Sequence, residues 1–331
     1  MTPTPAHRIR FVAARRAALA LLAVLHIAAP AVAQTAASST PAASSPSNAL
    51  TPEIVQVTVK ESGPRGADVS MPVQVFKPTL SQANAGAGPW PVVIFSHGRA
   101  TTVQDRQNLS TPVLSGHVRY WHAKGYAVIA PIRPGYGPNS AHDPEASGTR
   151  FPSSGNGPCT GLAQYAKVVE ASTRAVRSAH DWLREQPWAN KDRVLLVGQS
   201  VGGLTTAAAC GQNWPGVIGC VNFAGGSGGK PDTHAGKSCQ PERLGQVYAE
   251  AGKTTQVPSL WLYSENDLYW GPDVPKQWHK ANVDAASAAG QKTVAEFFAA
   301  PPVDPDGHRL LASGGRFWSP PLNAWLKKHG F

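Results

Sequence analysis

Runs of consecutive apolar residues recur along this chain and are separated by longer mixed segments. An alternating polar and apolar segment at residues 53–60 is typical of a half-exposed strand, and a second short strand is predicted at 72–77. Continuous apolar runs are typical of strands that are buried on both faces of a sheet. These runs lie at 92–95, 126–130, 194–197, 217–223, 257–263 and 293–298.

Segments with helical spacing lie between most of these strands. The clearest one covers residues 163–186 and stops at Pro187, which cannot continue a helix. Buried strands that alternate with helices predict an α/β fold, in which a mostly parallel sheet of about eight strands has helices on both faces. The Gly-, Ser- and Pro-rich segments 137–161 and 225–241 follow strands. They are therefore expected at the carboxyl edge of the sheet, where open α/β sheets bind ligands.

The first 33 residues have the pattern of a signal peptide. A mostly apolar run, Ala17 to Ala29, lies between a positive segment and the small-residue cleavage site Ala31-Val32-Ala33. The alternative, a transmembrane anchor, is disfavoured because the run is too short to span a bilayer. The pair Arg15-Arg16 leaves a twin-arginine signal open. The positive segment contains Arg8, Arg10, Arg15 and Arg16.

The rest of the chain is expected to hold a linker and one catalytic domain. Residues 34–52 are rich in Ala, Ser, Thr and Pro, which is typical of a flexible linker, and residues 53–331 form the domain. Lys and Arg number 30 and Asp and Glu 20, so the formal net charge is +10. Loss of residues 1–33 removes four arginines and no acid, which leaves +6. These charges are scattered and form no basic stripe, so we expect no nucleic-acid partner.

One segment has the features of a nucleophile elbow. The sequence Gly198-Gln199-Ser200-Val201-Gly202 follows the apolar run 194–197 and precedes a helix-forming stretch, 204–209. This strand–turn–helix context predicts that Ser200 is a catalytic nucleophile, because the sharp turn exposes the serine hydroxyl. A second match to the same motif, Gly225 to Gly229, follows a strand but leads into Lys230-Pro231-Asp232, so we interpret it as a loop.

A serine nucleophile needs a base and an acid that orients the base. Asp267 follows the apolar run 257–263 closely, and Glu265 is its competitor. The expected base is His308, in the loop after the last predicted strand. His279 and His329 are the alternatives, and both are expected at the surface.

The oxyanion that forms in such a reaction needs two preset backbone donors. We expect the N–H of Val201, directly after the nucleophile, and the N–H of Arg99, in the loop after the third strand. His97 in the same loop is expected to orient the loop, with substrate binding as the other possibility. Arg133 and Tyr136 follow the fourth strand and are candidates for contact with substrate, although Arg99 and Arg133 can equally pair with structural carboxylates.

The four cysteines are compatible with disulfides in an exported protein. None has C-x-x-C spacing, so a zinc or redox motif is not expected. Cys159 and Cys239 each lie in one of the two long loops, and we predict a disulfide between them. Cys210 is expected about a turn before the end of its helix and Cys220 midway along the next strand. Their heights would then differ by roughly 6 Å, so buried thiols are favoured and a bridge is the alternative.

These motifs together resemble the dienelactone hydrolase-like branch of the α/β-hydrolases, over about residues 90–310. Dienelactone hydrolase proper uses a cysteine nucleophile, whereas this chain has Ser200. The resemblance therefore implies an esterase-like hydrolase that needs no metal or organic cofactor. The matching segments are His97-Gly98, Arg133-Pro134-Gly135-Tyr136-Gly137, Gly198 to Gly203, Asn222 to Gly226, Tyr263 to Asp267 and Asp306-Gly307-His308.

Three functions are compatible with these residues. The first is hydrolysis of short or medium esters of small or aromatic acids, at a site walled by the loops 137–161 and 225–241. Neither loop has the large apolar residues that a lipase lid needs. The second is a serine peptidase of the prolyl-oligopeptidase type, and the third is a ligand-binding protein without activity. In each case the expected partner is a small molecule or peptide, with no stable insertion in a membrane after cleavage of the leader.

Overall fold

The structure is a computed structural model that describes residues 50–78, 88–100, 102–292 and 295–331. The predicted signal peptide, 1–33, and residues 34–49 of the predicted linker lie outside these described residues. The described residues form one compact unit, and its first strand begins at Glu53.

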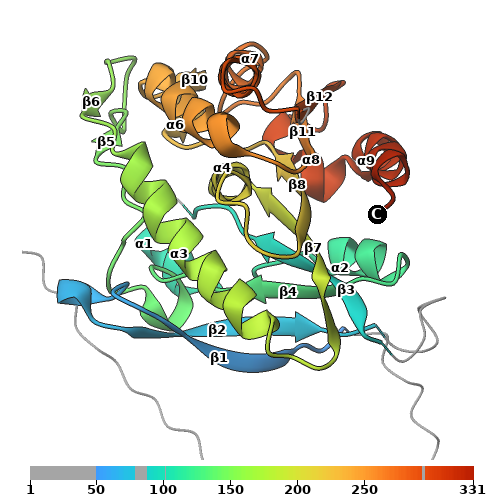
Figure 1. Cartoon of the computed structure of the whole chain (residues 1–331). Helices are drawn as coiled ribbons and strands as arrows, with labels where there is room; N and C mark the ends of the chain where they lie inside the picture. Colours follow the sequence, from blue (N-terminus) through green and yellow to red (C-terminus); the bar gives the residue numbers. More distant parts are fainter. Residues whose placement is uncertain (1–49, 79–87, 101, 293–294) are drawn as a thin grey trace, which may run out of the picture. The chain divides into compact units, whose positions relative to one another are not determined.

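An eight-stranded sheet forms the centre of this unit, as the pattern of apolar runs predicts (Figure 1). The strand order is β1-β2-β4-β3-β7-β8-β11-β12. The pairs β1–β2 and β2–β4 are antiparallel, and the other neighbours are parallel. The strands are β1 (Glu53–Val59), β2 (Val69–Phe76), β3 (Trp90–Ser96), β4 (Ala127–Pro131), β7 (Ala189–Gln199), β8 (Val217–Phe223), β11 (Ser259–Ser264) and β12 (Ala295–Ala300).

Helices cover both faces of the sheet, because successive apolar residues of a strand point to opposite faces. In β3, Val93 and Phe95 pack toward helices α2 and α9, whereas Val92 and Ile94 pack toward α3. The first face carries α2 (Ser115–His122), α8 (Leu310–Ser313) and α9 (Gly315–His329). The second face carries α3 (Tyr165–Leu183), α4 (Val201–Cys210), α6 (Pro241–Thr254) and α7 (Val274–Ala288). In the described ranges no helix combines the length and the apolar character that crossing a bilayer requires.

Short helices and short strands lie in the loops between these longer strands and helices. The segment 137–161 contains a two-stranded ribbon, and the segment 225–241 contains another with a single helical turn. Both segments were predicted as long loops, and their Gly, Pro and Ser content explains why only short elements form there. The short elements are η1 (Pro64–Gly66), α1 (Val103–Gln107), η2 (Gly137–Asn139), β5 (Thr149–Arg150), β6 (Thr160–Gly161), β9 (Gly229–Lys230), α5 (Pro231–His234), β10 (Ala235–Ser238) and η3 (Gly307–Arg309).

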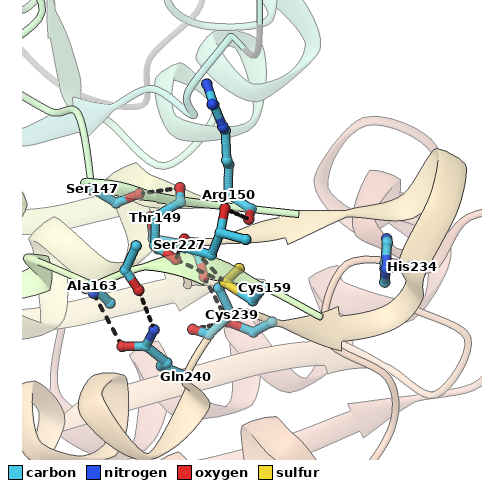
Figure 2. Close-up of a disulfide and its surroundings, with 12 residues drawn as sticks. Ser147, Thr149, Arg150, Cys159, Ala163, Ser227, His234, Cys239 and Gln240 are labelled. Carbon is cyan, nitrogen blue, oxygen red and sulfur yellow. Dashed lines mark hydrogen bonds between the residues drawn. A yellow bond between two sulfur atoms is a disulfide. The ribbon is translucent and has the colours of Figure 1, made fainter. Parts of the chain in front are cut away.

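A disulfide joins Cys159 and Cys239 and thereby ties the two long loops together, as predicted (Figure 2). Their Cα atoms lie 5.6 Å apart, within the usual range for a bridge. The next residue, Gln240, strengthens this junction. Its side chain accepts a hydrogen bond from the N–H of Ala163 and donates one to the carbonyl of Gly161.

A second disulfide joins Cys210 and Cys220, so the favoured prediction of buried thiols is wrong. Helix α4 ends at Cys210 itself and not a turn later, and the chain turns back directly toward β8. The two Cα atoms are consequently 6.3 Å apart, which a disulfide can span. The prediction that Cys210 and Cys220 lie at different heights assumed a helix one turn longer than α4.

We predict that the two disulfides differ in their effect on stability. The bridges close segments of 80 and 10 residues, so the chain-entropy model gives about 4 and about 3 kcal/mol respectively. Replacing Cys159 and Cys239 by Ser should therefore lower the free energy of unfolding more than replacing Cys210 and Cys220 does. Urea unfolding of the two variants measures this order, and peptide mapping without reduction shows the linkages. An equal loss or the reverse order would contradict the prediction.

Candidate active site

Ser200 lies on a sharp turn between β7 and α4. The strand ends at Gln199, the helix begins at Val201, and Ser200 between them has φ 59° and ψ −125°. A positive φ is unfavourable for a residue with a side chain, and such strain is typical of functional sites. The N–H of Ser200 is held by the carbonyl of Phe223, at 2.9 Å, in the neighbouring strand β8. The turn therefore has the geometry expected of a nucleophile elbow.

The glycines on either side of Ser200 are required by close packing. A Cβ on Gly202 would overlap the backbone carbonyl of Ser96 at the end of β3, and one on Gly198 would overlap the carbonyl of Gly202. The first turn of α4 can therefore lie against β3 only without these side chains. This approach brings Ser200 next to the loop that follows β3.

His308 lies beside Ser200, with its Nε2 atom 3.0 Å from the Ser200 Oγ. The ring belongs to the short helix η3, which begins after Asp306. The Asp306 carboxylate accepts hydrogen bonds from the N–H groups of His308 and Leu268, at 2.9 and 3.0 Å. The histidine loop is thus fixed to the loop that follows β11.

Asp267 completes the chain of contacts, because its Oδ2 lies 3.0 Å from Nδ1 of His308. Its other oxygen accepts hydrogen bonds from the N–H groups of Tyr269 and Trp270, at 2.8 and 3.2 Å. Asp267 is almost fully buried, whereas the competitor Glu265 is exposed to solvent. The structure thus brings together Ser200, His308 and Asp267.

The two alternative histidines lie elsewhere and have other partners. His279 on α7 contacts the carbonyl of Ala295, and His329 at the end of α9 pairs with Glu296. Neither has a contact with Ser200 among the described residues. The second serine motif forms a loop beside the site: the N–H of Gly226 donates to the backbone carbonyl of Ser200 at 3.1 Å, and the carbonyl of Ser227 accepts a hydrogen bond from Ser238 beside the long-loop disulfide.

Comparison with solved structures identifies the architecture. The chain is similar to a Pyrococcus horikoshii acylaminoacyl peptidase, with 14% identity, a TM-score of 0.52 and coverage of 83% of this chain and 41% of that one. It is also similar to a Pyrococcus furiosus esterase, with 13% identity, a TM-score of 0.51 and coverage of 84% and 93%. This chain has the α/β-hydrolase fold.

Further comparisons show one weaker likeness and a difference in length, and no sequence match. A protein from Klebsiella pneumoniae described as a dienelactone hydrolase is 18% identical over 83% of this chain and 97% of that one. Its TM-score is only 0.45. This chain spans about two fifths of the length of the first peptidase structures that it matches. No family model matches the sequence, and neither does any curated protein.

The two residues predicted to supply the oxyanion donors lie close to Ser200. Val201 is the first residue of α4, so its N–H has no acceptor within the helix. A Cβ on Gly98 would lie only 3.2 Å from the Cβ of Ser200, so the backbone that leads into Arg99 runs beside the nucleophile. The side chain of Arg99 points to Asp143 and forms two hydrogen bonds with it, at 2.8 and 2.6 Å.

His97 orients the loop after β3, as predicted. Its Nδ1 lies 2.7 Å from the carbonyl of Gly98, and its Nε2 accepts the N–H of Arg133 at 3.2 Å. These contacts select the neutral ring with the proton on Nδ1. Burial, and after it the charge of Arg133, holds the pKa of His97 well below its usual range. Both ring nitrogens are used within the protein, so neither is free for substrate.

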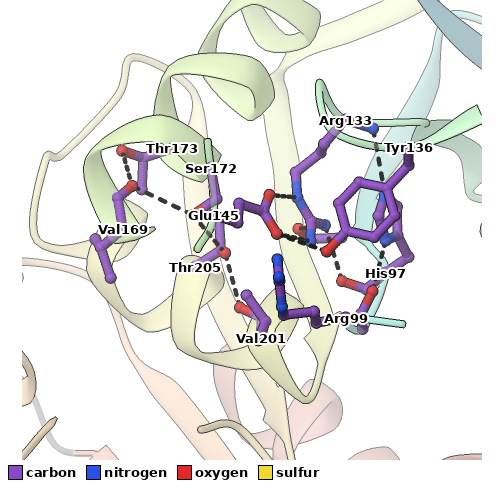
Figure 3. A network of polar contacts seen from close by, with 12 residues as sticks. His97, Arg99, Arg133, Tyr136, Glu145, Val169, Ser172, Thr173, Val201 and Thr205 are labelled. Carbon is purple, nitrogen blue, oxygen red and sulfur yellow. Dashed lines mark hydrogen bonds and ion pairs between the residues drawn. The ribbon is translucent and has the colours of Figure 1, made fainter. Parts of the chain in front are cut away.

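Arg133 and Tyr136, the other candidates for substrate contact, lie beneath the site and do not line it. Both side chains are fully buried, and both bind the carboxylate of Glu145 (Figure 3). Arg133 thus pairs with a structural carboxylate, the favoured alternative to substrate contact, and Tyr136 binds the same carboxylate. Their position soon after the end of β4 does not bring these side chains to the surface, and a side chain without solvent access cannot contact a ligand.

A cavity of about 290 Å³ opens beside His308 on the side of the β3 loop. It is bordered by the segment 109–114 and by residues 309–312, and not by the two long loops that were expected to wall the site. Pattern analysis missed residues 109–114, although their position after β3, at the carboxyl edge, could have indicated them. The lining residues are Phe95, His97, Gly98, Leu109, Thr111, Pro112, Leu114, Gln199, His308, Arg309, Leu311 and Ala312.

In the described part of the chain, no group of three or more His, Cys, Asp or Glu side chains is placed to hold a metal ion. The arrangement offers proton transfer between the Ser200 hydroxyl and His308, with the Asp267 carboxylate orienting the imidazole.

We predict that Gly202→Ala destabilises the protein by more than about 2 kcal/mol, because the added methyl group meets a backbone carbonyl in a close-packed turn. Gly116→Ala is the matched control. Gly116 lies in helix α2, and its added methyl group would meet no atom within 4 Å. That substitution should leave stability unchanged or raise it by up to about 1 kcal/mol. Thermal and urea unfolding compare the two, and equal stability of both variants would refute the close packing.

Proposed function

We propose that this chain is a serine hydrolase that cleaves carboxylic esters of small or aromatic acids through an acyl-enzyme intermediate. The observation that supports the proposal best is the pair of 3.0 Å contacts that links Ser200, His308 and Asp267. A serine hydroxyl becomes an effective nucleophile when an adjacent base removes its proton, and these contacts provide such a base.

The proposed reaction begins with attack of the Ser200 Oγ on the ester carbonyl carbon. The hydroxyl proton passes to Nε2 of His308, and the carboxylate of Asp267 stabilises the resulting imidazolium. The negative charge moves to the former carbonyl oxygen, where the N–H groups of Val201 and Arg99 are the proposed donors. When this intermediate collapses, the ester C–O bond breaks and the leaving alkoxide takes the proton from His308.

The second half of the proposed reaction releases the acid. Water attacks the acyl group on Ser200 and gives a proton to the same Nε2 atom of His308. The second tetrahedral intermediate then expels the Ser200 oxygen, which recovers its proton from the histidine. Tyr269 and Trp270 pack against His308, with ring centroids 4.0 and 5.4 Å from that of the imidazole, and hold it in place for both steps.

The cavity beside His308 supports the proposed substrate class. Its wall includes Phe95, Leu109, Pro112, Leu114, Leu311 and Ala312, which suit an apolar group. A volume of about 290 Å³ suits a short chain or an aromatic ring better than a long acyl chain. Apolar pockets with a few polar groups at the reacting end are typical of small-molecule sites.

A serine peptidase remains the second candidate, because one of the similar structures is an acylaminoacyl peptidase. A peptidase that binds a free amino terminus needs a carboxylate near the site, and the residues that line the cavity include no Asp or Glu, which argues against that type of peptidase only. A ligand-binding protein without activity is the third candidate, and labelling with a fluorophosphonate probe separates it from the other two.

Export is part of this proposal. Two disulfides suit an oxidising compartment, and the leader pattern at residues 1–33 suits transfer to the periplasm or the medium. Free thiols at all four positions in protein isolated from its natural compartment would argue against export.

We predict that Ser200→Ala and His308→Ala each lower kcat/KM by about 10⁴-fold or more, with little further loss in the double variant, because the two residues act as one unit. Asp267→Asn should also remove most turnover. Glu265→Gln is the matched control, since it removes an exposed carboxylate two residues away and should retain full activity. Full activity in Ser200→Ala would end the proposal, and loss only in the Glu265 variant would move the acid by two residues.

We predict, second, that the enzyme prefers short-chain and aromatic esters to long-chain esters and to matched peptide amides. A panel of nitrophenyl esters of increasing acyl length, with nitroanilide amides of the same acids, measures this preference as ratios of kcat/KM. Activation at the surface of long-chain triglyceride emulsions would contradict the substrate class. A preference for the amides would favour the peptidase.

A further inference from the structure

A fully buried ion pair lies directly beneath the loop that follows β3. The Nε atom of Arg133 donates to one Glu145 oxygen at 2.6 Å, and Nη2 donates to the other at 3.1 Å (Figure 3). The hydroxyl of Tyr136 donates to the second oxygen at 2.8 Å. Arg133 and Glu145 are 0% and 1% exposed. Burying two charges costs several kcal/mol per ion before pairing repays it, so such a pair is a poor source of stability.

Other donors of Arg133 point to the β3 loop. Nη1 donates to the hydroxyl of Ser96 at 2.9 Å and to the backbone carbonyl of His97 at 2.8 Å. The backbone N–H of Arg133 donates to Nε2 of His97 at 3.2 Å. Three hydrogen bonds from Arg133 therefore hold Ser96 and His97. These two residues precede Gly98, and the backbone of Gly98 lies against Ser200.

A second ion pair holds the other end of the same loop. The Arg99 guanidinium binds Asp143 through two hydrogen bonds, and Arg106 lies 3.5 Å from the same carboxylate. Asp143 and Glu145 belong to one loop, 137–161. This loop thus supplies a carboxylate on each side of residues 96–99, and it is itself tied to the loop 225–241 by the long-loop disulfide.

We propose that Arg133 and Glu145 are positioning residues that hold the β3 loop so that the N–H of Arg99 points at the oxyanion. This inference rests on the proposed hydrolase function. Neither side chain reaches the substrate, so their action is through the backbone. Displacement of a catalytic group by about 1 Å lowers a rate by about 100-fold, and the guanidinium is suited to prevent it, because its planar fork fixes several acceptors at once.

The test is Glu145→Gln, which keeps the shape of the side chain and removes its charge. We expect kcat to fall by about 10- to 100-fold, since loss of one oxyanion donor costs about 100- to 1,000-fold and misplacement costs less. KM should change by no more than about threefold, because the ground-state ester does not need the donor. An arylboronic acid, whose adduct with Ser200 places an oxygen in the oxyanion site, should lose affinity by the same factor as kcat/KM.

Milder variants keep the test meaningful if Glu145→Gln fails to fold. Tyr136→Phe and Ser96→Ala each remove one hydrogen bond of the network and should lower kcat and boronate affinity together, by about 3- to 10-fold. Leu183→Ala is the control for general destabilisation. Leu183 is fully buried on α3 in the core of the other face, so its loss should lower the melting temperature and leave kcat unchanged.

The outcomes separate this inference from the function on which it rests. Absence of hydrolysis and of fluorophosphonate labelling in the unmodified enzyme would refute the proposed function before any variant is made. If the unmodified enzyme is active, unchanged kcat and unchanged boronate affinity in the network variants overturn the positioning role. A parallel fall in both, without a matching fall in Leu183→Ala, supports it.

Discussion

The contact between the first turn of α4 and the end of β3 is the constraint on which the candidate site depends. Gly202 lies so close to the carbonyl of Ser96 that any side chain there would collide with it. Because the helix starts from this contact, Ser200 is forced into a positive φ and its hydroxyl is presented at the carboxyl edge of the sheet. The same contact places the nucleophile beside the β3 loop. The packing of α4 against β3 therefore positions both the proposed oxyanion donors and the attacking oxygen.

Different loops hold the groups on the two sides of Ser200. On one side, loop 137–161 supplies the carboxylates that hold the β3 loop from below. On the other, the loop after β11 provides Asp267 and is joined to the histidine loop through Asp306. The two sides are connected, because the Cys159–Cys239 disulfide links loop 137–161 to loop 225–241. Gly226 and Gly229 of that second loop approach Trp270, whose ring packs against His308. Loops with few apolar residues thus obtain their order from ion pairs and a covalent bond.

The fold and the residues that meet at Ser200 were accessible from local patterns, whereas the surroundings of the site were not. The run 194–197 and its following glycines indicated the sharp turn at Ser200, and the position of Asp267 after an apolar run indicated its place at the same edge, because strand ends of a parallel sheet meet there. Arg133 and Tyr136 follow a strand in the same way but are buried, and the sequence contained no sign that Glu145 would bind both of them. The cavity wall at 109–114 was missed, since its residues become neighbours of His308 only through the crossing of separate loops.

Sequence by itself therefore determined the order of strands and helices, the strand–turn–helix context of Ser200 and the pairing of Cys159 with Cys239. These features depend on periodicity and on the directions of neighbouring elements, which short-range physical rules describe. The tertiary structure decided which charged groups are buried, which loops wall the cavity and whether Cys210 reaches Cys220. Those outcomes depend on distances of a few ångströms between segments far apart in the chain, and a shift of one helical turn is enough to change them.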